Sequence, residues 1–237
     1  MHRSSLLAFL LARIISSQAA QTLIPTTCFS SESALESYFN YLYPWGSDHN
    51  GGARMDKAHI AISSDTLTLT AQSVTGQPST KQGGKTIQIN YLSGTVNAKT
   101  HFTVTAGGAL NFSAQFQAPT AKGTWPAFWL TAVQGWPPEV DMAEWKGDGK
   151  ISFNTFNTSS QVEAKDVTYS DPGKWHDVRA ELRDENGKDV AVKFYLDGKE
   201  EANQVGKAFV GTAMYLIIDL QMEGSSGSPG PKSSTYF

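Results

Sequence analysis

The chain has 237 residues, of which 40% are hydrophobic, 11% aromatic and 17% charged, and its formal net charge is −3. This apolar content is enough for a sizeable core and excludes a wholly disordered chain. Because acidic and basic residues are interspersed, we expect no nucleic acid partner and no binding to an anionic membrane surface.

Residues 1–20 have the pattern of a secretory signal peptide. A basic residue, Arg3, precedes an apolar run over residues 6–15, and small residues suited to cleavage follow near Ala19. A membrane anchor is the alternative, but this run is interrupted by Arg13 and is shorter than the about twenty residues that a span needs. We therefore expect the segment to be removed and the mature chain to be secreted and extracellular.

Residues 31–42 are the segment whose spacing favours a helix. Ser31 or Ser33 is suited to cap it, and apolar residues recur three and four positions apart. An irregular arm laid over the core is the alternative. The single cysteine, Cys28, can form no disulfide within the chain and no cysteine-based zinc site, so we interpret it as a buried or incidental thiol.

From about Ala58 onward, alternation of apolar and polar residues predicts β-strands. The clearest runs are IAISS, TLTLTA, KTIQINYLSGTV, THFTVTA, LNFSAQFQA, KISFNTFN, WHDVRAELRD, DVAVKFYLDG and MYLIIDLQ. Clusters of Gly, Pro, Ser and Asp separate them, as in an antiparallel sandwich or barrel. With no internal repeat and no dividing linker, residues 21–237 are expected to form one all-β domain.

The chain ends soon after a polar segment at residues 223–234 that is rich in Gly, Ser and Pro. Three strand-like residues, Thr235, Tyr236 and Phe237, follow it. One interpretation is that a terminal strand begins there and that its remainder is missing from the chain. A disordered tail is the other.

The stretch WPPEVDMAEWKGD places Glu139, Asp141 and Glu144 among residues that otherwise have a buried character. A helix would scatter the three acids around its axis, and the neighbouring segments are strand-like. A regular strand would put Ala143 on the face of the first two acids, because side chains alternate. A β-bulge near Met142 or Ala143 returns Glu144 to that face, so a bulged strand with three aligned acids is favoured.

Aligned acids repel each other, and this repulsion raises the pKa of one carboxyl group toward the range in which it acts as an acid near neutral pH. On a flat strand the α-carbons of the outer pair would be roughly 13 Å apart. A retaining glycosidase holds its two carboxyl groups about 5.5 Å apart. A concave sheet with converging side chains would therefore be needed.

Glu139-Val-Asp141-Met-Ala-Glu144 resembles the Glu-x-Asp-x-x-Glu signature of glycoside hydrolase family 16 in its bulged form. The stretch FSAQFQAPTAKGTWPAFWLT resembles the segment that precedes the catalytic strand of this family, and INYLSGTV resembles its Tyr-x-Ser-Gly segment. WHDVRAEL, VKFYLDGKE and LIIDLQMEG are similar to later strands, in the right order. The resemblance covers about residues 56–237.

This resemblance implies a β-jelly-roll sandwich of two curved antiparallel sheets, with a cleft on the concave face. It further implies that the protein hydrolyses a β-linked polysaccharide with retention of configuration. Matched position by position, Glu139 would be the nucleophile, Glu144 the general acid and then base, and Asp141 the assisting carboxylate. No cofactor and no metal are expected, because Asp48, Asn50 and the residues after them do not complete a calcium-binding loop.

Sugar rings have apolar faces, so a glycan cleft needs aromatic platforms as well as polar groups. By the family match, Trp125 and Trp136 are the platform candidates. Trp45 and Arg54 are further candidates, because they belong to a segment that forms either a cleft-edge loop or an ordinary polar loop. Asn154 is a candidate because it stands where members that cut 1,3-glucans often carry a His.

Several neighbouring residues are interpreted as structural. Phe128 and Trp129 are expected to pack in the core or beneath the cleft, and Trp175 is expected to pack because large aromatic residues in strands usually do. His176 is interpreted as a partly buried strand residue and not as a general base, since the acids already supply that function.

The substrate is left open by two departures from members that cut 1,3-glucans. Asn154 replaces the His, and the loop MEGSSGSPGP lacks the family's Trp. A β-1,3 or mixed-linkage β-1,3(1,4)-glucan is expected, as the commonest family substrate. The alternatives are an endo-β-1,3-galactanase, a transglycosylase, or a non-catalytic lectin-like domain, and we expect a monomer.

Overall fold

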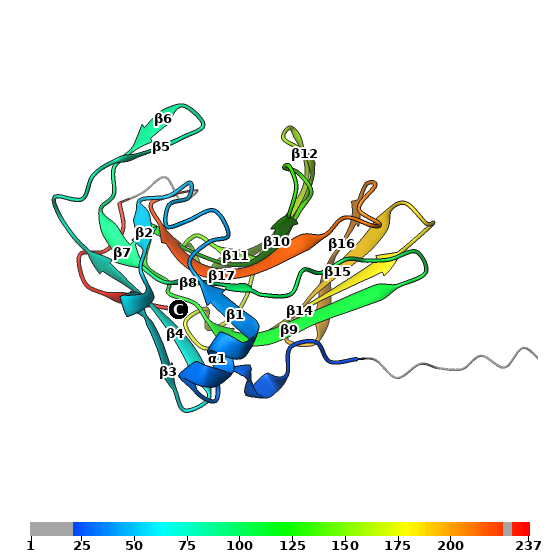
Figure 1. The fold of residues 1–237 in the computed structure, drawn as a ribbon, viewed down its shortest axis with the longest axis horizontal. Helices are drawn as coiled ribbons and strands as arrows, with labels where there is room; N and C mark the ends of the chain where they lie inside the picture. Colours follow the sequence, from blue (N-terminus) through cyan, green and yellow to red (C-terminus); the bar gives the residue numbers. More distant parts are fainter. Residues whose placement is uncertain (1–20, 225–228) are drawn as a thin grey trace, which may run out of the picture.

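The computed structural model describes residues 21–224 and 229–237, so the predicted signal peptide lies outside the described residues. Within these residues the strands form two facing layers (Figure 1). The first layer is a seven-stranded antiparallel sheet in the order β1 (Phe39–Tyr41), β8 (Thr95–Ala98), β17 (Met214–Met222), β10 (Thr124–Ala132), β11 (Glu139–Trp145), β12 (Lys150–Thr158) and β13 (Gln161–Thr168).

The second layer contains two smaller sheets. One has the order β16 (Lys199–Gly206), β15 (Val190–Leu196), β14 (Trp175–Asp184) and β9 (Ala109–Gln117). The other has the order β18 (Thr235–Tyr236), β4 (Thr66–Ser73), β7 (Tyr91–Ser93) and β2 (Ala53–Met55), with β3 (Ile60–Ser63) paired to β4. β2 and β7 pair in parallel, whereas the strands around them pair antiparallel.

Side-chain alternation explains how the two layers meet. On β14 every second residue, Val178, Ala180 and Leu182, is buried, and these side chains join Val140 and Met142 of β11 in one hydrophobic core. The intervening residues of the two strands face outward. The opposite face of the seven-stranded sheet therefore has polar positions free to line a site, and the structure confirms the predicted all-β sandwich of curved sheets.

The predicted helix at 31–42 forms but is shorter than expected. α1 runs over Glu32–Tyr38, after a 3-10 turn, η1 (Thr26–Phe29), and Ser31 caps it by accepting a hydrogen bond from the backbone of Ala34 at 3.1 Å. Phe39 then adopts an extended conformation, because it pairs with β8 as the first residue of β1. Pairing with the sheet therefore overrides the helical spacing of the last residues.

Two segments between the early strands differ from the expectation. The Gly, Pro and Ser-rich stretch before the predicted strand run KTIQINYLSGTV contributes a strand of its own, β5 (Thr80–Gln82), which forms a small hairpin with β6 (Lys85–Ile87), and the turn is made by Gly83 and Gly84 at φ values of 55° and 78°. A second 3-10 turn, η2 (Lys57–His59), precedes β3. In Figure 1 the hairpin rises on one side of the seven-stranded sheet, and the end of β12 rises on the other.

The last residues of the chain form a short strand, β18, where a terminal strand was expected to begin. Thr235 and Tyr236 pair with β4, and Phe237 continues this pairing through two backbone hydrogen bonds to Leu69. The ring of Phe237 stacks on Phe116, with centroids 5.3 Å apart. The final strand is therefore part of the packed second layer. A search of the described part of the chain finds no helix with the length and apolarity needed to cross a membrane.

Candidate active site

The bulge predicted in β11 is present. Against β12, Asp141 lies opposite Asn154 and Glu144 lies opposite Ser152, so two residues of β11 are accommodated where β12 has one. The register against β10 shifts at the same place. Because of this extra residue, Glu144 returns to the face of the sheet that carries Glu139 and Asp141.

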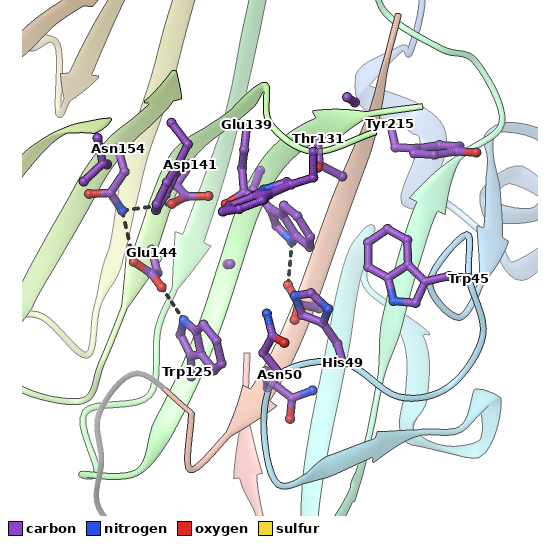
Figure 2. A pocket seen from close by; sticks show the side chains of 18 of the residues that line it. Trp45, His49, Asn50, Trp125, Thr131, Glu139, Asp141, Glu144, Asn154 and Tyr215 are labelled. Carbon is purple, nitrogen blue, oxygen red and sulfur yellow. Dashed lines mark hydrogen bonds between the residues drawn. The ribbon is translucent and has the colours of Figure 1, made fainter. Parts of the chain in front are cut away.

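The three acids line one cavity on the outer face of the seven-stranded sheet. It has a volume of about 940 Å³, which is within the range of ligand-binding clefts. Its floor comes from β10, β11, β12 and β17, and the β5–β6 hairpin contributes Gln82 and Gly83 to its rim. Figure 2 shows the acids on one side of this cleft and Trp45 with His49 on the other.

Glu139 lies at the start of β11 and is held by an indole. The Nε1 group of Trp136 donates a hydrogen bond to its Oε2 at 2.9 Å. Burial raises the pKa of Glu139 to about 7, against the hydrogen bond from Trp136, and the charges of Glu144 and Asp219 raise it further. This carboxyl group therefore exchanges its proton near neutral pH.

Glu144 is 8% exposed and has polar partners on both oxygens. Trp125 donates its indole N–H to Oε1, and the side-chain amide of Asn154 donates to Oε2 at 3.1 Å. The ammonium group of Lys146 lies 3.4 Å from the same Oε2. These donors fix the direction in which the carboxyl group points into the cleft.

Asp141 is the most enclosed of the three acids. It accepts a hydrogen bond from the amide of Asn154 at 2.9 Å, and the same amide group reaches Glu144 (Figure 2). Burial, followed by the charges of Glu139 and Glu144, raises the pKa of Asp141 well above its usual range. Burial therefore favours the protonated form of Asp141, and in that form its carboxyl group can donate a hydrogen bond to a neighbouring carboxylate.

The candidate aromatic platforms differ in exposure. Trp136 is 50% exposed and Trp45 is 46% exposed, and both line the cleft. Trp125 also lines it but is partly buried, with its N–H committed to Glu144. The exposed indole rings of Trp136 and Trp45 are thus available for stacking on sugar rings. Trp125 is placed to orient the carboxyl group of Glu144.

Arg54 is not brought to the cleft. Its guanidinium forms a bidentate pair with Asp48, at 2.8 and 3.0 Å, and also donates to the carbonyl of Pro78 at 3.2 Å. These contacts tie the loop after β1 to the segment that leads into the β5–β6 hairpin. The geometry therefore gives Arg54 a bracing contact at the base of the cleft rim and not a place among the lining residues.

Trp175 was expected to be a packed side chain, but the structure leaves half of it exposed. Trp175 is 51% exposed because the alternation of β14 puts positions 178, 180 and 182 inward and position 175 outward. His176 lies partly buried in the same strand, as predicted, with Nδ1 2.8 Å from Oδ2 of Asp197. Burial opposes protonation of His176, but the bonds to Asp197 and to the Asp171 carbonyl outweigh it and raise the pKa.

The sequence reasoning missed two residues that line the cleft or support its wall, Asp219 on β17 and Tyr43, which donates a 2.6 Å hydrogen bond to Asp219. His49, which belongs to the segment expected to form either a cleft-edge loop or an ordinary polar loop, packs beside Tyr43 and lines the cleft. A signal for Asp219 exists, because it is the one charged residue in the run MYLIIDLQM. A lone acid in such an apolar strand requires specific partners.

Comparison with known proteins identifies related chains. The model of the family "Glycosyl hydrolases family 16" matches residues 50–203. A galactan endo-β-1,3-galactanase of Flammulina velutipes is 52% identical over 220 residues, which cover 92% of this chain and 87% of that protein. An endo-1,3-1,4-β-glycanase of Rhizobium meliloti (strain 1021) is 24% identical over 177 residues, covering 72% of this chain but only 35% of that protein.

Solved structures with the same fold include a laminarinase and an endo-β-1,3-glucanase. The laminarinase catalytic domain from Thermotoga maritima MSB8 matches with a TM-score of 0.64 and 16% identity, over 84% of this chain and 87% of that one. The endo-β-1,3-glucanase from Pyrococcus furiosus matches with a TM-score of 0.65 and 16% identity, over 84% and 82%. At this identity the likeness shows the shared jelly-roll fold alone.

Proposed function

Since the chain belongs to glycosyl hydrolases family 16, and is therefore a glycoside hydrolase, we propose that it is a secreted endo-β-1,3-galactanase that acts with retention of configuration. The observation that carries the choice of substrate is the 52% identity to a galactan endo-β-1,3-galactanase over 92% of the chain. It favours the galactan alternative over the β-glucan expected from the sequence. Asn154, in place of the His of members that cut 1,3-glucans, agrees with this choice.

The proposed reaction proceeds in two displacements. The Glu139 carboxylate attacks the anomeric carbon, and the bond from that carbon to the glycosidic oxygen breaks as the oxygen takes the proton of Glu144. The sugar is then held as an ester of Glu139. In the second step Glu144 takes a proton from water, the water oxygen bonds to the anomeric carbon, and Glu139 leaves as a carboxylate.

The environment of each acid supports its part in these steps. The indole of Trp136 favours the charged form of Glu139, which attack requires, and a protonated Asp141 would favour it further by donating a hydrogen bond. Trp125 and Asn154 hold the Glu144 carboxyl group toward the cleft in both steps. The order of the roles, Glu139 before Glu144, comes from the family motif.

Secretion is proposed from the N-terminal sequence alone. Residues 1–20 combine a basic start, an apolar run and small residues near Ala19. Expression of the full chain in a secreting host, followed by N-terminal sequencing of the protein in the medium, tests this step. A mature start near residues 20–21 is expected.

The substrate is tested with a panel of three polysaccharides: β-1,3-galactan, laminarin and mixed-linkage β-glucan. Release of reducing ends from galactan is expected to be faster by about tenfold or more than release from either glucan, because a site that binds the axial O4 of galactose rejects its epimer. Chain length should fall before monosaccharide accumulates. Faster cleavage of laminarin would overturn the galactan proposal, and binding without cleavage would support a lectin.

Exposed tryptophans inside and outside the cleft allow a controlled test of whether Trp45 and Trp136 stack on sugar rings. Replacement of Trp45 or Trp136 by alanine is expected to raise KM for galactan by about tenfold, since each loses a stacking face in the cleft. Trp136→Ala should also lower kcat, because Glu139 loses its indole donor. Trp175→Ala is the control, because Trp175 has the same exposure outside this cleft.

The measurement is KM and kcat for galactan, determined by steady-state kinetics for the three variants. An unchanged KM in Trp45→Ala would remove Trp45 from the substrate site. An equal rise of KM in Trp175→Ala would show that loss of an exposed indole acts through general destabilisation and not through the cleft.

A further inference from the structure

A further carboxylate lies in the cleft and has no part in the two displacements. Asp219 on β17 is 2% exposed and lines the same cavity as the three acids of β11. It lies opposite Ala127 of β10, and Ala127 in turn lies opposite Glu144. Asp219 and Glu144 therefore belong to one row across the sheet, with a methyl side chain on the strand between them.

Each oxygen of Asp219 accepts a hydrogen bond from an aromatic residue. Tyr43 donates its hydroxyl to Oδ2 at 2.6 Å, and Trp129 donates its indole N–H to Oδ1 at 2.9 Å. The two donors come from different segments, the loop after β1 and the strand β10. A carboxylate is suited to join them, because both of its oxygens are acceptors.

The two aromatic residues belong to a larger group, here called the aromatic wall, which consists of Tyr43, Trp45, His49 and Trp129. The ring of Tyr43 is parallel to that of Trp45, with an interplanar angle of 4° and centroids 5.3 Å apart. His49 packs against Trp129 at 5.5 Å and against Trp45 at 5.3 Å. Trp45 is thus supported from behind while its exposed part faces the cleft (Figure 2).

Burial of the Asp219 carboxylate disfavours its charged form. Burial raises the pKa of Asp219 to about 7, against the hydrogen bonds from Tyr43 and Trp129, and the charge of Glu144 raises it further. Its other titratable neighbour in the wall is His49, whose pKa burial lowers to about 4, so that it is neutral at neutral pH. A side chain kept against such a penalty points to a role beyond folding.

We infer that Asp219 is a positioning residue: it fixes Tyr43 and Trp129, and through them it holds Trp45 where a galactan ring beside the reacting sugar stacks. This inference rests on the proposed function, because it names a further binding element of that same site. Asp219 acts on substrate affinity through the wall and not on the bond-breaking step.

The test is a double-mutant cycle on Asp219 and Trp45. In Asp219→Asn the shape is kept, but the amide offers one acceptor oxygen, which the indole N–H of Trp129 requires, and an NH₂ group toward Tyr43, so Tyr43 can no longer donate its hydroxyl to a carboxylate. Tyr43→Phe keeps the ring but removes the hydroxyl. Each change is expected to raise KM for galactan by about tenfold, as loss of a hydrogen bond to a charged group predicts. The change in kcat should stay below about threefold.

Because Asp219 acts through Trp45, the effects should not add. Asp219→Asn combined with Trp45→Ala is expected to raise KM no further than Trp45→Ala alone. The same cycle is measured as the affinity of galacto-oligosaccharides by calorimetry in the Glu139→Gln background, where cleavage does not interfere. Additive effects, or a fall in kcat at unchanged KM, would overturn the inference.

Failure of the proposed function gives a different result. If the wild-type protein cleaves laminarin or mixed-linkage glucan and not galactan, the proposed substrate is wrong, and the cycle is then measured on the glucan that is cleaved. Non-additivity there still supports the role of Asp219, and additivity still contradicts it. If Asp219→Asn does not fold, Tyr43→Phe combined with Trp45→Ala provides the same cycle.

Discussion

Replacement of Glu139 by alanine is expected to lower the rate of galactan hydrolysis by about 10⁴-fold or more, because the group that captures the sugar is lost. Azide in the assay should restore part of the activity on an aryl galactoside with a good leaving group. With Glu144 still present, azide enters from the side of the missing carboxylate, and the product is expected to be the α-galactosyl azide.

Glu144→Ala is the matched variant. With Glu139 intact the sugar ester still forms from the activated substrate, and azide replaces water in the second step, so the β-galactosyl azide is expected. The two azides are distinguished by the coupling constant of the anomeric proton. The β product from Glu139→Ala together with the α product from Glu144→Ala would reverse the two roles.

Replacement of Glu139 by glutamine is expected to stabilise the fold at pH 8 by about 1–3 kcal/mol, although it removes activity. Burial raises the pKa of Glu139 from 4.5 to about 7 in the fold. Between these values the folded chain holds more protons than the unfolded chain, so this group's contribution to stability falls as pH rises to about 7. Glutamine carries no charge to desolvate and escapes this loss.

The measurement is the free energy of unfolding by denaturant at several values of pH. The difference between Glu139→Gln and the wild type should be small near pH 4, rise up to about pH 7 and then stay level. Glu163→Gln, on the exposed strand β13, is the control and should show no such rise. A difference that does not change with pH would show that Glu139 is not held in a desolvated site.

Much of the fold could be predicted because alternation in strands records which face is buried. The runs around β9, β14 and β15 show this alternation clearly, and burial in the structure follows it. The bulge was predictable for the same reason, since Glu144 is one position out of step with Glu139 and Asp141. A charged side chain in a strand of buried residues has few places to point, and this limits the possible conformations of the strand.

The rest depends on contacts between segments that are distant in sequence. Nothing around Arg54 shows that Asp48 will take its guanidinium, and the helical spacing that includes Phe39 does not show that β8 will pair with it. Asp219 is recognisable as an unusual residue, but its role depends on Tyr43, which lies 176 positions away. Trp175 was misplaced because preference for burial was given more weight than strand phase.

The most direct test of the central claim, that the acids of the bulged strand form a retaining pair acting on β-1,3-galactan, is the anomeric form of the first product. Proton NMR during the first minutes of galactan cleavage should show new reducing ends as the β anomer, with the α anomer appearing later by mutarotation. Reducing ends that appear first as the α anomer, or no cleavage of galactan at all, would contradict this account.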